Sequence, residues 1–255
     1  MFKPALKTKT EQLSSTLYLA EFKLVEPVHS KPLPLQFTNI WIPGVDEIPM
    51  SIADYEEEKQ VLRIIFKVVG EGTRSLRDRS GFFGVKGFLG NGFKTRGHDR
   101  ILFVAGGSGI APLPLLTRYC TIDNCIVDVV WGVKSSDMLF NIEKVALNPG
   151  SVYYATEDCS YGFCGMVPQV LQYIIEKEGV KWSTIIAVGP KPMLKSICST
   201  IDPSIEVYVS LETMVKCGLG ACGSCVLKPL PKLLCIHGPV FKCNEVNEFL
   251  ESTHD

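Results

Sequence analysis

The chain has 255 residues, of which 46% are hydrophobic, which is enough for one large or two moderate domains with packed cores. Its formal net charge of −1 provides no basic excess for binding nucleic acid. Its first residues, Met1-Phe2-Lys3-Pro4, do not resemble a signal peptide, and we expect none. Glycines and prolines interrupt its longest apolar stretch, residues 101–116, which is shorter than the about 18 residues of a membrane span. We therefore expect a soluble, cytoplasmic protein.

Residues 1–96 are predicted to form strands and turns. Residues 17–24 alternate apolar and polar side chains with the period of a half-buried strand. Further strands are expected over residues 35–42, 50–55 and 61–69, separated by turns that contain proline and glycine. Short strands without helical periodicity predict a small antiparallel β-barrel.

Residues 97–210 show a different rhythm, in which strands alternate with helices. Strands are expected over residues 101–105, 126–131, 151–156, 184–188 and 205–210. Helices are expected over residues 112–120, 138–147, 167–177 and 192–199. This alternation predicts a parallel sheet flanked by helices. With residues 211–255 as a small third domain, the fold class is multi-domain α+β.

The third region contains four cysteines with a distinctive spacing. Cys217, Cys222, Cys225 and Cys235 follow the pattern C-x4-C-x2-C-x9-C, which is the plant-type spacing for a [2Fe–2S] cluster. Glycines between them give the loop the backbone freedom to turn around a cluster. The alternatives are a zinc site, which would need a second pair of ligands where only His237 accompanies Cys235, and disulfides. The pattern indicates a protein that transfers electrons in a reducing compartment.

A glycine-rich turn predicts a second cofactor site. Gly106, Gly107 and Gly109 lie directly between a predicted strand and a predicted helix. Such a turn lets the backbone approach a phosphate at a helix N-terminus. A second turn, residues 189–193, follows another strand, and both turns fall at the carboxyl ends of the strands, where ligands bind. A purely structural turn is the alternative, because the pattern is not G-x-G-x-x-G.

The predicted barrel has its own candidate turns. Residues 48–51 begin one strand and residues 68–75 follow another. A hydroxyl, two glycines and several backbone N–H groups are suited to a flavin and its pyrophosphate. Ordinary structural turns are the alternative.

Several motifs occur together in a recognisable order over nearly the full chain. They are Ile-Pro-Met-Ser at 48–51, Gly-x-Gly-Thr at 70–73, Gly-Phe-Leu-Gly-Asn-Gly at 87–92, Ala-Gly-Gly-Ser-Gly-Ile-Ala-Pro-Leu at 105–113, Thr-Glu-Asp at 156–158 with Ser-Tyr-Gly at 160–162, Gly-Pro-x-x-Met at 189–193, and the cysteine motif with His-Gly-Pro-Val-Phe at 237–241. In this order they resemble the ferredoxin reductase superfamily, and more closely the electron transfer subunits of dihydroorotate dehydrogenase B.

The resemblance implies an FAD-binding barrel over residues 1–96, an NAD-reductase-like domain over 97–210 and a [2Fe–2S] domain over 211–255. It implies an FMN-containing catalytic subunit as partner, which oxidises dihydroorotate to orotate in pyrimidine biosynthesis, in a heterotetramer of two subunits of each kind. Electrons would pass from FMN through the cluster and FAD to NAD, with no catalytic residue for carbon chemistry on this chain.

The resemblance also implies roles for single residues. The FAD contacts would be Ile48, Pro49, Met50, Ser51, Ile65, Phe66, Lys67, Gly72 and Thr73. Gly106, Gly107 and Gly109 would contact NAD, and Cys217, Cys222, Cys225 and Cys235 would hold the cluster. One position departs from the family, which usually has arginine where this chain has Ile48. The change removes a charged contact to phosphate or flavin, for which Lys67 or Arg74 could compensate.

Six cysteines lie outside the cluster motif. Cys120 with Cys125, and Cys159 with Cys164, repeat the C-x4-C spacing without a third cysteine, so we expect ordinary, partly buried thiols. Cys198 is expected in the core of a helix, and Cys243 is expected not to bind metal.

Two other functions are compatible with the sequence. One is the flavin and iron–sulfur subunit of a hydrogenase or of an NAD(P)H:ferredoxin oxidoreductase, and the other is a zinc-stapled binding module. For the leading interpretation, the partner should bind near the cluster, at Leu219, Ala221 and residues 236–241.

Overall fold

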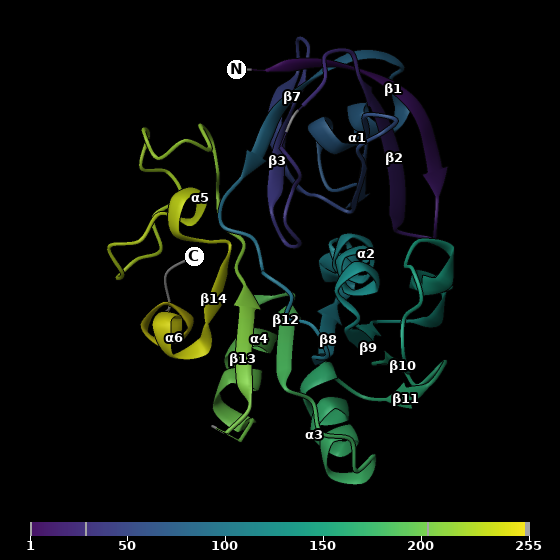
Figure 1. Cartoon of the computed structure of the whole chain (residues 1–255), viewed down its shortest axis with the longest axis vertical. Helices are drawn as coiled ribbons and strands as arrows, with labels where there is room; N and C mark the ends of the chain where they lie inside the picture. Colours follow the sequence, from purple (N-terminus) through teal and green to yellow (C-terminus); the bar gives the residue numbers. More distant parts are fainter. Residues whose placement is uncertain (1, 29, 203, 253–255) are drawn as a thin grey trace.

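The computed structural model describes residues 2–28, 30–202 and 204–252. Two seven-stranded sheets organise them, one above the other along the long axis (Figure 1). The first is antiparallel and takes its strands from the N-terminal third of the chain. The second is mostly parallel and includes a strand from the C-terminal region.

The first sheet has the order β4-β3-β7-β1-β2-β6-β5. Its strands are β1 (Lys3–Gln12), β2 (Leu17–Leu24), β3 (Phe37–Ile42), β4 (Asp46–Ser51), β5 (Asp54–Glu56), β6 (Val61–Lys67) and β7 (Gly81–Leu89). Helix α1 (Glu71–Asp78) connects β6 to β7. The sheet curls so that the edge strand β4 contacts β6, which encloses an apolar core and gives the predicted barrel shape.

The second sheet has the order β11-β10-β9-β8-β12-β13-β14. Its strands are β8 (Arg100–Gly106), β9 (Ile126–Val133), β10 (Val152–Thr156), β11 (Phe163–Cys164), β12 (Thr184–Val188), β13 (Glu206–Ser210) and β14 (Val240–Lys242). All neighbours run parallel except β13 and β14. The five strands predicted for this region are confirmed.

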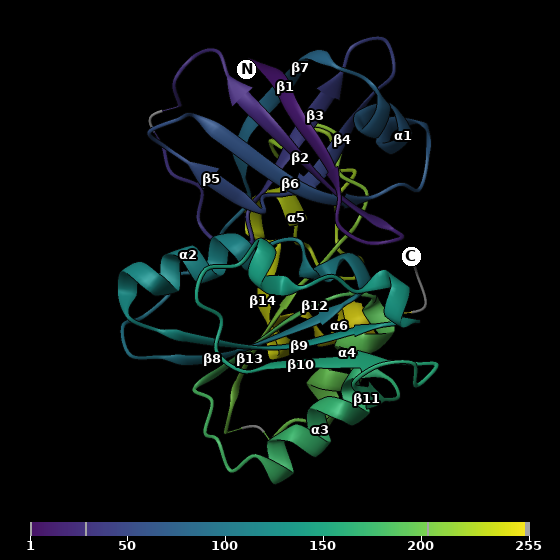
Figure 2. The ribbon, with the colours of Figure 1, turned by 90° about the vertical axis from the view of Figure 1, so that its right-hand side faces the viewer.

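Helices cover both faces of the parallel sheet. Helix α2 (Leu113–Asp123) lies between the sheet and the barrel, while α3 (Val167–Lys177) and α4 (Lys191–Thr200) lie on the opposite face (Figure 2). Each of these three helices has proline in its first turn, where the missing N–H is not needed. Helix α2 ends at Asn124 in the left-handed conformation, which is typical of a helix C-terminus.

The two faces of the parallel sheet bury separate apolar clusters. Leu102 and Val104 of β8 face one cluster, and Ile101, Phe103 and Ala105 of the same strand face the other. This follows from the alternation of side chains along a strand, and burial on both faces explains the continuous apolar sequence of β8.

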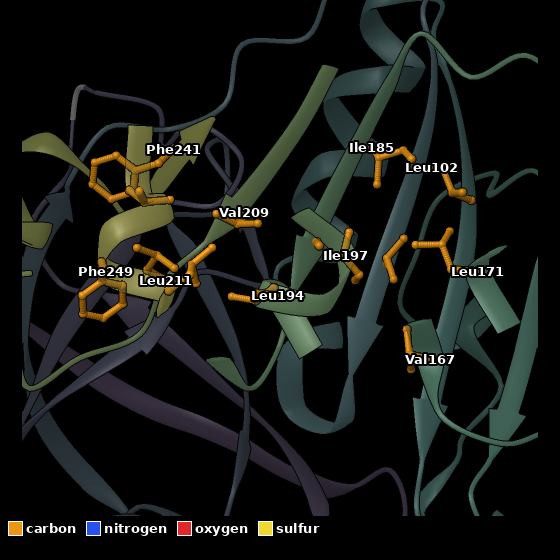
Figure 3. Packing of buried hydrophobic residues seen from close by; sticks show 14 of the residues in the cluster. Leu102, Val167, Leu171, Ile185, Leu194, Ile197, Val209, Leu211, Phe241 and Phe249 are labelled. Carbon is orange, nitrogen blue, oxygen red and sulfur yellow. The ribbon is translucent and has the colours of Figure 1, made fainter. Parts of the chain in front are cut away.

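The C-terminal residues continue the same core. Helix α5 (Leu234–His237) is followed by β14 and by α6 (Cys243–Glu251), which packs on α4. Figure 3 shows the side chains of Phe241 and Phe249 continuing through Leu194 towards Leu171. The cysteine region is therefore joined to the central sheet through β14 and α6.

Three local predictions were wrong. The strand expected over residues 50–55 is split into β4 and β5, because Ile52 and Ala53 are buried and the Ala53 N–H group bonds to Arg63 of β6 in place of the β3 side. The helix expected over 138–147 is replaced by 3₁₀ turns at Ser136–Met138 and Ile142–Lys144. Helix α1 was missed, because it has only eight residues, contains a glycine and has a single large apolar side chain, Leu76.

The expectation of ordinary thiols for Cys120, Cys125, Cys159 and Cys164 is also wrong, and Cys198 and Cys243 pair with each other as well. The six cysteines form the disulfides Cys120–Cys125, Cys159–Cys164 and Cys198–Cys243. The fold brings the Cα atoms of the pairs to 4.6, 4.4 and 5.6 Å, within the range of a disulfide. The third pair joins α4 to the start of α6 across 45 residues of sequence, a proximity that spacing cannot show.

None of the helices in the described ranges is long and apolar enough to cross a membrane.

Candidate functional site

The four cysteines of the motif are the free cysteines of the described chain. Cys217, Cys222 and Cys225 lie in the loop after β13, and Cys235 lies in α5. Gly218 has a φ of +68°, which favours glycine, and a Cβ atom there would lie 2.7 Å from Leu89 Cδ1. Glycine at this position therefore allows the loop to lie directly against the barrel.

The thiols are arranged as two interacting pairs. Cys225 and Cys235 are both buried, and their Sγ atoms lie 3.3 Å apart. Cys222 is exposed and interacts with Cys217. A cluster with two irons and four thiolates needs two ligands for each iron, and these four cysteines supply that number and chemistry. In the described residues their side chains do not converge as a group of three or more metal ligands.

The two pairs differ in electrostatic environment. Hydrogen bonds from Ser224, together with backbone and Cys217 contacts, lower the pKa of the Cys222 thiol to about 6. Burial and the neighbouring Cys225 raise the pKa of the Cys235 thiol to about 11. Since the thiolate is the form that binds metal, the exposed Cys222 offers the readier first ligand of these two cysteines.

A cavity of about 750 Å³ lies at the carboxyl ends of the parallel strands, between the sheet and the barrel. The predicted residues Gly106, Gly107 and Gly109 line it, together with the second glycine turn at 189–193. A Cβ atom on Gly109 would lie closer than 3.0 Å to the carbonyl oxygen of Val188. Glycine at position 109 therefore permits the close contact between the two turns. The indole nitrogen of Trp131 also holds the first turn, by donating a 2.9 Å hydrogen bond to the Gly107 carbonyl oxygen.

The other walls contain residues that the sequence analysis missed. Lys134, Glu157 and Glu212 follow the ends of β9, β10 and β13, and the first turn of α3 closes the far side. The strands themselves were predicted, so the rule that ligands bind at their carboxyl ends would have found these positions.

Glu212 lines the cavity and is exposed to the solvent within it, while the surrounding protein partly desolvates its carboxyl group. Desolvation raises the pKa of this carboxyl group. A carboxyl group in such a place retains its proton at higher pH, so it can donate a hydrogen bond to a ligand.

The predicted flavin residues lie in β4, β6 and α1. Ile48 of β4 packs against the first turn of α1. The two segments are so close that a Cβ atom on Gly72 would lie 3.1 Å from Ile48 Cγ2. The Thr73 hydroxyl accepts hydrogen bonds from the N–H groups of Val69 and Gly70, which shapes this turn. Gly72 and Thr73 are buried in this turn, and neither residue lines the cavity described above.

The end of β6 and the start of β2 reach the cavity from the barrel side. Ile65 and Phe66 are almost fully buried in the core, whereas the next residue, Lys67, lines the cavity beside Thr16 and Leu17. The barrel therefore contributes a cation and part of an apolar wall to the same space that the glycine turns line.

Comparisons with known proteins agree with this geometry. Residues 212–247 match the family described as the iron–sulfur cluster binding domain of dihydroorotate dehydrogenase B. A dihydroorotate dehydrogenase B (NAD(+)) electron transfer subunit from Bacillus pumilus is 37% identical over 209 residues, which cover 78% of this chain and 78% of the relative. A probable subunit of the same kind from Archaeoglobus fulgidus is 32% identical over 247 residues, which cover 94% and 97%.

One solved structure is similar over almost the whole chain. It is a chain from the structure of NADH-dependent reduced ferredoxin–NADP oxidoreductase, reported in work on flavin-based electron bifurcation. It has a TM-score of 0.83 and 25% sequence identity, and the match covers 97% of this chain and 91% of that one.

Proposed function

The chain belongs to the family of dihydroorotate dehydrogenase B electron transfer subunits, and we propose that it carries electrons from an FMN-containing catalytic subunit through a [2Fe–2S] cluster and FAD to NAD. The reaction would serve pyrimidine biosynthesis, and the chain is one component of an oxidoreductase. The observation that carries the proposal is the two pairs of free thiols, in a chain that also has a nucleotide-sized cavity.

The cofactors are assigned to three parts of the chain. Residues 1–96 would bind FAD through the β4, β6 and α1 positions described above. Residues 97–210 would bind NAD at Gly106, Gly107 and Gly109, and residues 211–255 would hold the cluster through the four free cysteines. The contacts between β4 and α1, the glycine-lined cavity and the paired thiols support these assignments.

This division of labour is chemically consistent. A flavin can exchange a hydride with a nicotinamide and single electrons with a cluster. The chain's own residues would bind and orient these groups, while the oxidation of dihydroorotate would take place on the catalytic subunit. We further propose a cytoplasmic heterotetramer of two subunits of each kind.

The experiment that tests this proposal is an anaerobic visible spectrum of the purified chain, with analysis of iron, acid-labile sulfide and flavin. FAD together with equal amounts of iron and sulfide is the expected result. Cluster without FAD would indicate that the flavin site at Ile48 has weakened. A colourless, zinc-containing protein would contradict the proposal.

The oxidoreductase structure with a TM-score of 0.83 supports a second candidate function. The chain would then be a flavin and iron–sulfur subunit of an NAD(P)H:ferredoxin oxidoreductase or hydrogenase. Identifying the subunit that copurifies with the chain distinguishes the two, since only the first candidate requires a dihydroorotate-oxidising partner.

The partner is proposed to bind over the cysteine loop. Leu219 and Ile236 are large apolar side chains that remain 59% and 44% exposed there. Replacing Leu219 with glutamate should place a charge in the interface and weaken the complex with the catalytic subunit about tenfold, or about 1.4 kcal/mol. The measurement is the dissociation constant of the purified subunits, by calorimetry or interferometry.

The matched control is Ile122→Glu, since Ile122 is an exposed apolar residue of α2 outside the cysteine loop. It should leave the dissociation constant unchanged. If Leu219→Glu and the wild-type chain bind the catalytic subunit with equal affinity, the cysteine loop is not part of the interface.

A further inference from the structure

Three polar side chains lie where the barrel meets the cysteine loop. Asn39 of β3 is directly opposite Lys86 of β7, and Glu47 lies on the neighbouring strand β4. Asn39 Nδ2 donates to Glu47 Oε1 at 2.6 Å, and Lys86 Nζ lies 2.7 Å from the same oxygen. The carboxylate therefore holds both donors in place.

The same two donors bind the cysteine loop. Asn39 Nδ2 donates to the Lys216 carbonyl oxygen at 2.8 Å, and Lys86 Nζ donates to the Cys217 carbonyl oxygen at 3.2 Å. The first carbonyl group belongs to Lys216, which directly precedes the motif. The second belongs to Cys217, the first cysteine of the motif. Figure 1 shows the loop lying beside β3 and β7.

The group is largely shielded from water. Asn39 is fully buried, and the side chains of Lys86 and Glu47 are 14% and 29% exposed. Asn39 Oδ1 has no hydrogen-bond partner, but the opposite amide orientation would place this oxygen against two acceptor oxygens. Because screening by water is weak here, the charges of Lys86 and Glu47 act strongly on any charged group held by the adjacent cysteine loop.

Strand β4 lies between the two proposed cofactor sites. Its Ile48 faces α1 at the proposed flavin site, and the preceding Glu47 reaches the lysine beside the cysteine loop. This follows from the alternation of side chains along a strand.

We propose that Lys86, held by Glu47, sets the reduction potential of the cluster, and that Asn39 positions the loop that binds it. The inference rests on the proposed function, in which Cys217 is a cluster ligand. Reduction adds one negative charge to the cluster. The Lys86 ammonium stabilises that charge and raises the potential, whereas the Glu47 carboxylate destabilises it and lowers the potential.

The test is a redox titration of the cluster in the purified holoprotein, followed by its visible and electron paramagnetic resonance spectra. Lys86→Met should lower the midpoint potential, and Glu47→Gln should raise it. We expect each to change the equilibrium constant for reduction roughly tenfold, which is about 59 mV for a one-electron couple. Lys86→Arg retains the charge and should remain close to wild type.

Lys59→Met is the matched control, since Lys59 forms an exposed pair with Glu56 away from the cysteine loop. It changes the net charge by the same amount and should leave the potential unchanged. Iron and sulfide are measured for every variant.

A wild-type potential in Lys86→Met with its iron retained would overturn the inference. If Lys86→Met loses its iron, the cluster potential of Glu47→Gln becomes the deciding measurement. An unchanged or lower potential in Glu47→Gln would contradict the proposed effect. A wild-type chain that binds no cluster would instead contradict the proposed function itself.

Discussion

Replacing Cys225 with serine is expected to leave the chain without an iron–sulfur cluster. Cys225 is buried and its Sγ lies 3.3 Å from that of Cys235, so its loss removes one partner of the buried thiol pair. A serine hydroxyl does not ionise near neutral pH and is a poor substitute for a thiolate. We expect at least a roughly tenfold loss of bound iron and of the visible absorbance of the cluster.

The double variant Cys159→Ser/Cys164→Ser provides the matched control. It removes two cysteines that form a disulfide beside β11, outside the cysteine loop. Its iron and sulfide content should equal that of wild type. Iron retention by Cys225→Ser, or equal loss in the control, would show that the ligands have been assigned wrongly.

Replacing Gly109 with alanine is expected to abolish reduction of the protein by NADH. The new methyl group would lie 2.7 Å from the carbonyl carbon of Val188, and nearer still to its oxygen. The contact is between backbones, so the turns after β8 and β12 must separate. Overpacking of this kind costs about 3 kcal/mol, which corresponds to a fall in melting temperature of about 6–12 °C.

The measurement combines thermal unfolding with NADH oxidation by ferricyanide as an artificial electron acceptor. Ser108→Ala is the control, because Ser108 lines the same cavity and its replacement adds no atoms. This control should retain its melting temperature. A Gly109→Ala protein with wild-type activity and stability would show that the glycine turns do not need to touch.

Much of the fold follows from local sequence patterns. The five parallel strands are predictable because each is a short run rich in apolar residues, largely buried in β8, β9 and β12 and partly buried in β10 and β13. Helices α2, α3 and α4 are predictable because they alternate with those strands and begin near prolines. The helix expected over residues 138–147 does not form: the side chain of Asn141 caps a separate 3₁₀ turn, and Phe140, Ile142 and Ala146 are buried in the core beside it.

The cysteine motif was recognisable from sequence because all four cysteines lie within one short segment. Ligand spacing there is set by local loop geometry, and the intervening glycines mark its turns. By the same reasoning, the glycine turns after β8 and β12 could be identified singly, each from its own neighbours.

The tertiary structure alone decided which distant residues meet. The Cys198–Cys243 disulfide depends on α6 packing against α4, and the cavity depends on the barrel placing Lys67 opposite the glycine turns. The contact of Lys86 with the Cys217 carbonyl group joins residues 131 positions apart. Local patterns determine which segments form strands, helices and metal-binding loops, but the approach of separate segments depends on packing between whole elements, which no single segment encodes.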